Sequence, residues 1–164
     1  MNPISNPTTL HVRNDDGTVL RAFGDEVVLK LTGAETNGQL TLWLDTTPPG
    51  GGPPAHYHTQ EDELFMVQEG EMSFLVDGEW QPAGAGSVVF APRGSVHTFR
   101  NVGETPSRML VLTQPSGFET FFARCAEEFK QPGEPDMDRI VAISSEHGIY
   151  YVNQVSQPLQ PACS

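Results

Sequence analysis

The sequence predicts an all-β domain, an antiparallel sandwich or barrel, followed by α-helices. Three observations lead to this prediction. Short apolar or alternating segments recur at regular spacing, glycine-rich turn signals separate them, and no helical pattern intervenes before Pro115. The 164 residues include 16 glycines and 14 prolines, a composition typical of many turns and short strands.

The strands are expected within residues 10–114. Asp77-Gly78 predicts a tight hairpin, because both central residues of that turn need a positive φ. No repeat or second domain is visible, so residues 1–164 are expected to form a single domain. The segments with strand character are 27–31, 40–44, 64–67, 72–76, 87–90 and 109–112.

The pattern changes after Pro115, and helices are expected within about 116–148. Apolar residues then recur with the helical period, and Ser116 with Glu119 predicts a capping box at the start of the first helix. These helices are expected to pack outside the barrel. The apolar face of the first helix consists of Phe118, Phe121, Phe122, Cys125, Ala126 and Phe129.

A second, weaker helix is expected from Pro135 to about His147, with Gly148 as its end signal. The polar residues 156–164 are expected to be a disordered tail. Cys125 is interpreted as a buried thiol and Cys163 as a thiol in the tail, with no chemistry assigned to either. The residues expected to face inward from the second helix are Met137, Ile140, Val141 and Ser144.

The net charge argues against two classes of partner. Nine basic and 21 acidic side chains give a charge of −12, which repels nucleic acid and anionic lipid. No apolar stretch approaches the roughly 20 residues needed to cross a bilayer. No signal peptide is visible at the N-terminus, so a cytoplasmic location is expected.

The histidines indicate a metal site. His56 and His58 flank one residue, so a strand would place both imidazoles on the same face. Glu61, Asp62 and Glu63 follow closely, and His97 lies further along the chain. Three imidazoles and one carboxylate would bind a divalent cation and leave two positions open. Such ligands suit Fe(II), Mn(II), Co(II), Ni(II), Cu(II) or Zn(II). His11 and His147 are interpreted as bystanders.

Two segments carry a resemblance to a known family. Residues 50–70, from Gly50 through His56, His58 and Glu63 to Gly70, fit the motif G(X)5HXH(X)3–4E(X)6G. Residues 86–101, which contain His97, fit G(X)5PXG(X)2H(X)3N. Every fixed position of both motifs is filled. The chain therefore resembles the cupin superfamily, and within it the small, single-domain proteins similar to quercetin dioxygenase.

The resemblance implies a cupin, or jelly-roll, antiparallel β-barrel with a metal at its centre. The metal ligands that it implies are His56, His58, Glu63 and His97, with Glu63 also catalytic as a proton acceptor. Strand parity alone makes Glu61 a rival ligand, and a bulge or turn between His58 and Glu63 is needed for Glu63 to face inward.

The walls of the substrate cavity follow from strand parity. If His97 and Glu63 point inward, the residues two and four positions further along the same strands should do so too. Such an apolar cavity suits a small aromatic or hydrophobic ligand. Parity selects Phe65, Val67 and Phe99 as candidate pocket residues, and Phe74, Phe90, Trp43 and Met109 are further apolar candidates.

Three functions remain open on the sequence. The leading hypothesis is an O₂-dependent, dioxygenase-like oxidoreductase acting on a small aromatic or enolisable substrate. A metal-dependent isomerase or lyase needs no O₂, but it needs an additional acid or base, and the motif strands offer no lysine. A non-enzymatic cupin that binds a small molecule is the third. Apolar helices and exposed strand edges also predict a homodimer.

Overall fold

The computed structural model describes residues 9–153, so the predicted disordered tail lies outside the described residues. Most regular elements are antiparallel strands, and the all-β prediction is confirmed. The largest sheet has six strands, in the order β1 (Thr18–Ala22), β2 (Asp25–Leu31), β3 (Thr41–Thr47), β10 (Ser107–Gln114), β5 (Asp62–Glu69) and β8 (Val88–Ala91).

Two smaller sheets complete the β-structure. One has the order β7 (Glu79–Ala83), β6 (Met72–Val76) and β9 (Thr98–Asn101), and the other pairs β11 (Ile149–Tyr151) with β4 (His56–His58). β6 and β7 are joined by the predicted hairpin, where Asp77 and Gly78 have φ of 50° and 82°. Within residues 9–153 the three sheets do not close into one hydrogen-bonded barrel, but their antiparallel arrangement fits the expected jelly roll.

The core lies between the six-stranded sheet and the three-stranded sheet of β7, β6 and β9. Side chains alternate between buried and half-buried along β3 and β10, as expected for strands with one face inward. Aromatic rings join the two sheets: Phe65 on β5 lies 5.2 Å from Phe74 on β6 and 5.8 Å from Phe99 on β9, between ring centroids. These contacts fix the separation of the sheets around the cavity.

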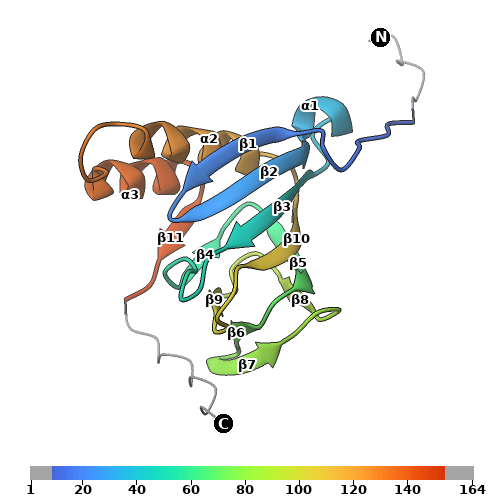
Figure 1. Cartoon of the computed structure of the whole chain (residues 1–164). Coiled ribbons are helices and arrows are strands. Elements are labelled where there is room, and N and C mark those ends of the chain that lie inside the picture. Colours follow the sequence, from blue (N-terminus) through green and yellow to red (C-terminus); the bar gives the residue numbers. More distant parts are fainter. Residues whose placement is uncertain (1–8, 154–164) are drawn as a thin grey trace.

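In the described part of the chain, three helices accompany the sheets: α1 (Gly33–Thr36), α2 (Phe118–Phe129) and α3 (Met137–Glu146). α2 and α3 lie together beside β1 and β2, at the end of the molecule opposite β6 and β7 (Figure 1). The helical period correctly predicted α2, whose residues Phe121, Phe122, Cys125 and Ala126 are buried. Burial raises the pKa of the Cys125 thiol to about 12, in keeping with an inert core residue.

The predicted capping box at the start of α2 is wrong. Gly117 is the N-cap residue, and no side chain caps the helix there. Glu119 instead accepts hydrogen bonds from the backbone N–H groups of Gly33 and Gly117, each at 2.8 Å, and from the Thr41 hydroxyl. Through these hydrogen bonds, Glu119 holds the start of α2 against the connection between β2 and β3.

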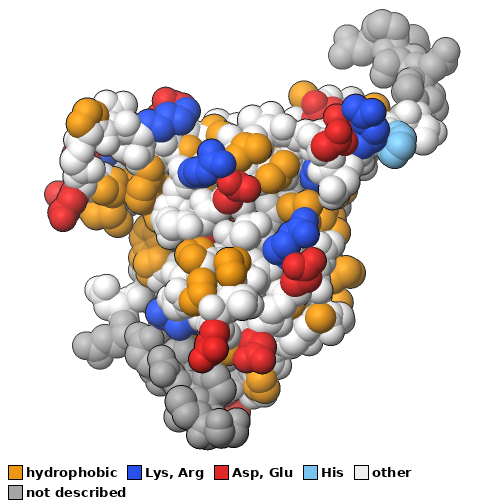
Figure 2. All heavy atoms as spheres, viewed as in Figure 1, with side chains coloured by type: hydrophobic (Ala, Val, Ile, Leu, Met, Phe, Trp, Pro, Cys, Tyr) orange, Lys and Arg blue, Asp and Glu red, His pale blue; other side chains and the backbone are white. Residues whose placement is uncertain are grey.

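The inward face of α3 is only partly as predicted. Ile140 and Ser144 are buried, but Met137 and Val141 are 53% and 50% exposed. The helix starts after the N-cap Asp136, and Ile143 rather than Val141 turns inward. Hydrophobic side chains are accordingly exposed at the corner formed by α2 and α3 (Figure 2).

The strand β11 was not expected from the sequence. It pairs with β4, so that Ile149 lies opposite His58 and Tyr151 opposite His56. The chain thus returns after α3 to support the strand that carries two candidate ligands. Within residues 9–153, no helix is long and apolar enough to cross a membrane.

Candidate metal centre

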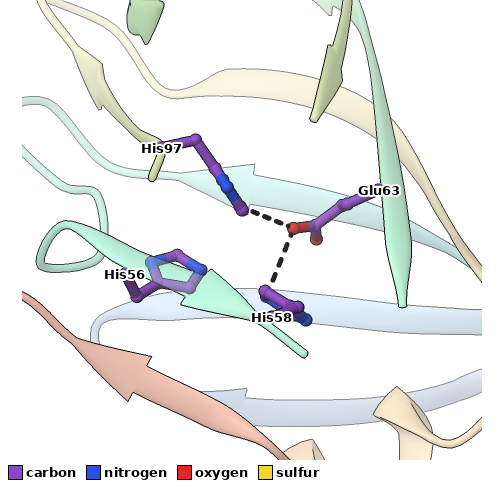
Figure 3. A group of neighbouring side chains, drawn as sticks. All are labelled: His56, His58, Glu63 and His97. Atoms are coloured by element: carbon purple, nitrogen blue, oxygen red, sulfur yellow. Dashed lines mark hydrogen bonds and ion pairs between the residues drawn. The ribbon is translucent and has the colours of Figure 1, made fainter. Parts of the chain in front are cut away.

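The candidate metal ligands come from three segments of the β-structure. His56 and His58 lie on β4 with their side chains on one side, as the spacing predicted. Glu63 is the second residue of β5, and His97 directly precedes β9 (Figure 3). His56 and His97 exchange two backbone hydrogen bonds, N to O at 3.1 and 2.9 Å. The loop 59–61 between β4 and β5 provides the turn that Glu63 needs to face inward.

The four side chains converge on one point. One ligand atom from each of His56, His58, Glu63 and His97 lies within 4.8 Å of the others. Glu63 Oε2 is 3.0 Å from His97 Nε2 and 3.5 Å from His58 Nε2. His58, Glu63 and His97 are buried, at 1%, 4% and 5% exposed. Such a group of nitrogen and oxygen donors could hold a divalent transition metal.

The Nδ1 atom of each imidazole, on the side of the ring away from the cluster, lies within hydrogen-bond distance of an oxygen atom. The Nδ1 atoms of His56 and His97 lie 2.8 and 3.0 Å from the carbonyl oxygens of Pro54 and Ser95. An Nδ1–H that donates to a carbonyl leaves the Nε2 lone pair free for a metal. Outer hydrogen bonds of this kind are typical of metal-binding histidines.

Glu61, which strand parity made a rival metal ligand, lies outside the group of four candidate ligands. Its Oε2 atom lies 3.2 Å from His58 Nδ1, so it orients His58 rather than joining the cluster as a ligand. His58 Nε2, on the inner side of the ring, is buried and has no hydrogen-bond partner among the described residues. A metal would satisfy this atom, so the residues present fit a bound cation.

Burial and the charges around the cluster shift the pKa values of its members in different directions. Burial, followed by the charges of His97 and His58, lowers the pKa of His56 to about 3, so this ring is neutral at pH 7. Burial opposes ionisation of Glu63, but the nearby histidines outweigh it and hold the pKa of the carboxyl below its usual value. Burial also opposes protonation of His58, whereas Glu63 and Glu61 raise its pKa above the usual value. A metal would take the place of that proton.

A cavity of about 70 Å³ opens beside the cluster. His56, His58 and Glu63 form part of its wall, and most of the remaining wall is aromatic. The aromatic side chains come from β3, β5, β9, β11, α2 and the turn between β1 and β2: Trp43, Phe65, Phe99, Tyr151, Phe118, Phe121, Phe122 and Phe23.

The candidate pocket residues lie at different places in the structure. Phe65 and Phe99 line the cavity. Val67 and Phe74 are buried in the core without lining it. Phe90 is 59% exposed, because it pairs with Leu64 on the outward face of β5. α2, which packs against the outside of the sheets, also contributes part of the cavity wall.

Sequence reasoning missed two acidic residues in the cavity. Asp25 and Asp45 line it and are only 7% and 6% exposed. They lie outside both cupin motifs and twenty positions apart. The available signal was the alternation along β3, where Asp45 shares the inward face with Trp43 and Thr47.

Comparison with known proteins agrees with this geometry. Residues 43–113 match the model of the cupin domain family. The chain contains a cupin domain.

This cupin is similar to proteins of different activities. It is 29% identical over 112 residues to quercetin 2,3-dioxygenase of Bacillus subtilis, covering 65% of this chain and 33% of the enzyme. It is 36% identical over 67 residues to the polyketide synthase CurC of Streptomyces cyaneus, covering 41% and 44%. The matches thus span about a third and under half of these relatives.

A solved structure supports the fold. A predicted oxalate decarboxylase from Thermotoga maritima superposes with a TM-score of 0.61 at 24% sequence identity, covering 65% of this cupin and 99% of that chain. At this identity the similarity concerns the fold alone. The activity must therefore be argued from the site.

Proposed function

We propose that this cupin is a metal-dependent enzyme that uses O₂ to oxidise a small aromatic or enolisable organic substrate. One observation carries the proposal: three imidazoles and one carboxylate converge at the wall of an aromatic cavity. A divalent transition metal held there would supply Lewis-acid chemistry, binding a phenolate or enolate oxygen and orienting the substrate toward O₂. The similarity to part of a quercetin dioxygenase supports the same reading.

The residues of the chain have separate roles in this proposal. His56, His58 and His97 would hold the metal, and their outer hydrogen bonds keep the rings in place. Glu63 would complete the ligand set and accept the proton that the substrate hydroxyl or C–H releases. The aromatic wall binds the apolar body of the substrate and excludes water.

A second candidate is a metal-dependent isomerase or lyase that needs no O₂. This chemistry requires an additional acid or base, which the motif strands did not offer. Asp25 and Asp45 line the cavity and supply such groups. The two candidates differ in a measurable way, because only the first consumes O₂.

Metal analysis tests the proposal first. We expect about one equivalent of a divalent transition metal in protein purified without chelator, and its loss in the His56→Ala/His97→Ala double variant, which removes two of four ligands. The His11→Ala/His147→Ala double variant is the matched control and should retain the metal. Absence of metal after reconstitution with each divalent ion would contradict the proposal and favour a binding protein.

Oxygen consumption then separates the two enzymatic candidates. The metal-loaded protein is supplied with phenols and diketones while O₂ is followed with an electrode. Product formation coupled to O₂ uptake supports the first candidate. Product formation that continues at the same rate without O₂ would support the second and contradict the first.

A further inference from the structure

Two buried carboxyl groups form a second polar region in the cavity. Asp45 lies on the inward face of β3, where it pairs with Val27 of β2. Asp25 is the first residue of β2 and the next inward residue before Val27, which brings the two carboxyl groups near one another. Both side chains line the cavity that the metal-ligand cluster also lines.

The hydrogen bonds of this pair are incomplete. Asp45 accepts hydrogen bonds from Thr47 Oγ1 at 3.0 Å and Trp43 Nε1 at 3.4 Å. Asp25 is buried, with only 7% of its surface exposed, yet its Oδ1 atom has no hydrogen-bond partner within residues 9–153. A buried oxygen without a partner costs free energy, so an unsatisfied atom on a cavity wall indicates a place for a ligand.

The cavity therefore has two unsatisfied polar atoms on a mainly apolar wall. His58 Nε2 belongs to the metal-ligand cluster, and Asp25 Oδ1 belongs to the acidic pair. A ligand that satisfies both regions must carry two polar groups separated by an apolar body. Pockets with a few polar groups in an apolar wall select their ligands in this way.

The protonation of the pair defines the polar group that it would bind. Burial, followed by the charge of Asp45, raises the pKa of Asp25 to about 8. Burial also raises the pKa of Asp45 to about 6, against the hydrogen bonds from Thr47 and Trp43 and with the charge of Glu63. Both shifts favour a protonated carboxyl within the pair, so the pair can both donate and accept a hydrogen bond. A hydroxyl group can do the same.

The shape of the cavity defines the apolar body. Trp43 and Phe118 both line the cavity, and their rings stack in parallel with centroids 4.3 Å apart. Parallel aromatic rings favour a flat ring as the next member of the stack. A single aromatic ring is the smallest apolar body that meets this condition.

We propose that Asp25 and Asp45 bind the second hydroxyl of a monocyclic dihydroxy-aromatic substrate whose first oxygen faces the His/Glu cluster. The inference rests on the proposed function, because the first oxygen needs the metal. It adds the substrate class and two specificity-determining residues outside the cupin motifs.

The test compares phenol with resorcinol and hydroquinone. Their second hydroxyl is too far from the first for both to chelate one metal ion. Affinities are measured by calorimetry under argon on the protein loaded with Zn(II), which does not oxidise the rings. We expect resorcinol or hydroquinone to bind the wild-type protein about tenfold more tightly than phenol, the size of a hydrogen bond to a charged group.

Variants of the acidic pair then locate this preference. In Asp25→Ala, which leaves space but removes the acceptor, the ratio of affinities should fall to about one. Glu26→Gln is the matched control on the same strand and should keep the wild-type ratio. If Asp25→Ala does not fold, Asp45→Asn keeps the shape of the pair, removes its charge and should lower the ratio at least threefold.

The outcomes distinguish this inference from the proposed function. Equal affinities for phenol and both dihydroxy compounds in the wild type would overturn the inference, as would an unchanged ratio in the acidic-pair variants. Zn(II) affinity is measured in the same experiments. Failure to bind Zn(II) in the wild type would instead contradict the proposed function.

Discussion

Asp25 is a residue whose burial should make the stability of the protein depend on pH. In the folded protein its pKa is raised from 3.8 to about 8, chiefly by burial and then by the charge of Asp45. Between these pH values the folded state binds more protons at this site than the unfolded state. The contribution of Asp25 to the free energy of unfolding therefore falls as pH rises from about 4 to about 8.

Replacing Asp25 by Asn should remove this pH dependence. We expect Asp25→Asn to stabilise the metal-free protein at pH 8.5 by on the order of 2 kcal/mol, and by distinctly less at pH 5.5. Urea unfolding at the two pH values measures the difference. Glu26→Gln is the control, since that side chain faces the solvent side of the same strand. An equal gain for Asp25→Asn at both pH values would contradict the explanation.

The residues differ in how far the sequence could predict them. His56, His58, Glu63 and His97 were identifiable because motif spacing places them together. Asp25 and Asp45 were not, because only the pairing of β2 with β3 brings them into one cavity.

At the scale of elements, helix periodicity and hairpin signals predicted α2 and the β6–β7 turn well. Apolar character was less informative, because it does not say which face of a strand points inward. Phe90 was a pocket candidate on this ground alone, and its register with Leu64 turns it outward. β11 was missed because three residues carry no detectable pattern, although pairing with β4 gives them a clear structural role.

Gly148 connects α3 to β11 at a close approach to the loop between β4 and β5. Its φ is 72°, and its carbonyl accepts a hydrogen bond from the N–H of Thr59 at 2.8 Å. A Cβ atom there would lie 2.4 Å from Thr59 Oγ1, which is too close for the present geometry. Gly133 also has a positive φ, of 96°, but a Cβ atom there would meet nothing within 4 Å.

Alanine at these two glycines should separate backbone strain from the close approach. We expect Gly133→Ala to cost about 1 kcal/mol of stability through strain alone. Gly148→Ala should cost more and also weaken Zn(II) binding severalfold, because the displaced loop directly follows His58. Thermal unfolding and metal titration measure the two effects. Equal behaviour of the two variants in both measurements would show that the β11–β4 connection does not position the site.

At the scale of the whole molecule, the outer face of the six-stranded sheet is apolar across its width. Strand register places apolar side chains opposite one another in two rows on the side away from the core. A sheet face of this kind is usually covered, because a large apolar patch in water is unfavourable. One row contains Val19, Val28, Leu44, Leu110, Met66 and Val88, and the other contains Leu42, Leu112, Leu64 and Phe90.

A second copy of the chain is the occupant that we expect on this face. A twofold axis would place the same apolar rows of two molecules against each other, and β8 is an edge strand that exposes Phe90 to 59%. The exposed corner of α2 and α3 offers a rival interface, where Met137 is 53% exposed.

If the wild-type protein is a dimer, light scattering should give about twice the monomer mass of 17.9 kDa. Phe90→Glu should shift the protein to monomer at micromolar concentration, because it introduces a charge into the apolar interface. Met137→Glu, with similar exposure, should leave the dimer intact. Dissociation by Met137→Glu but not by Phe90→Glu would place the interface on the helices instead, and a monomeric wild type would exclude both arrangements.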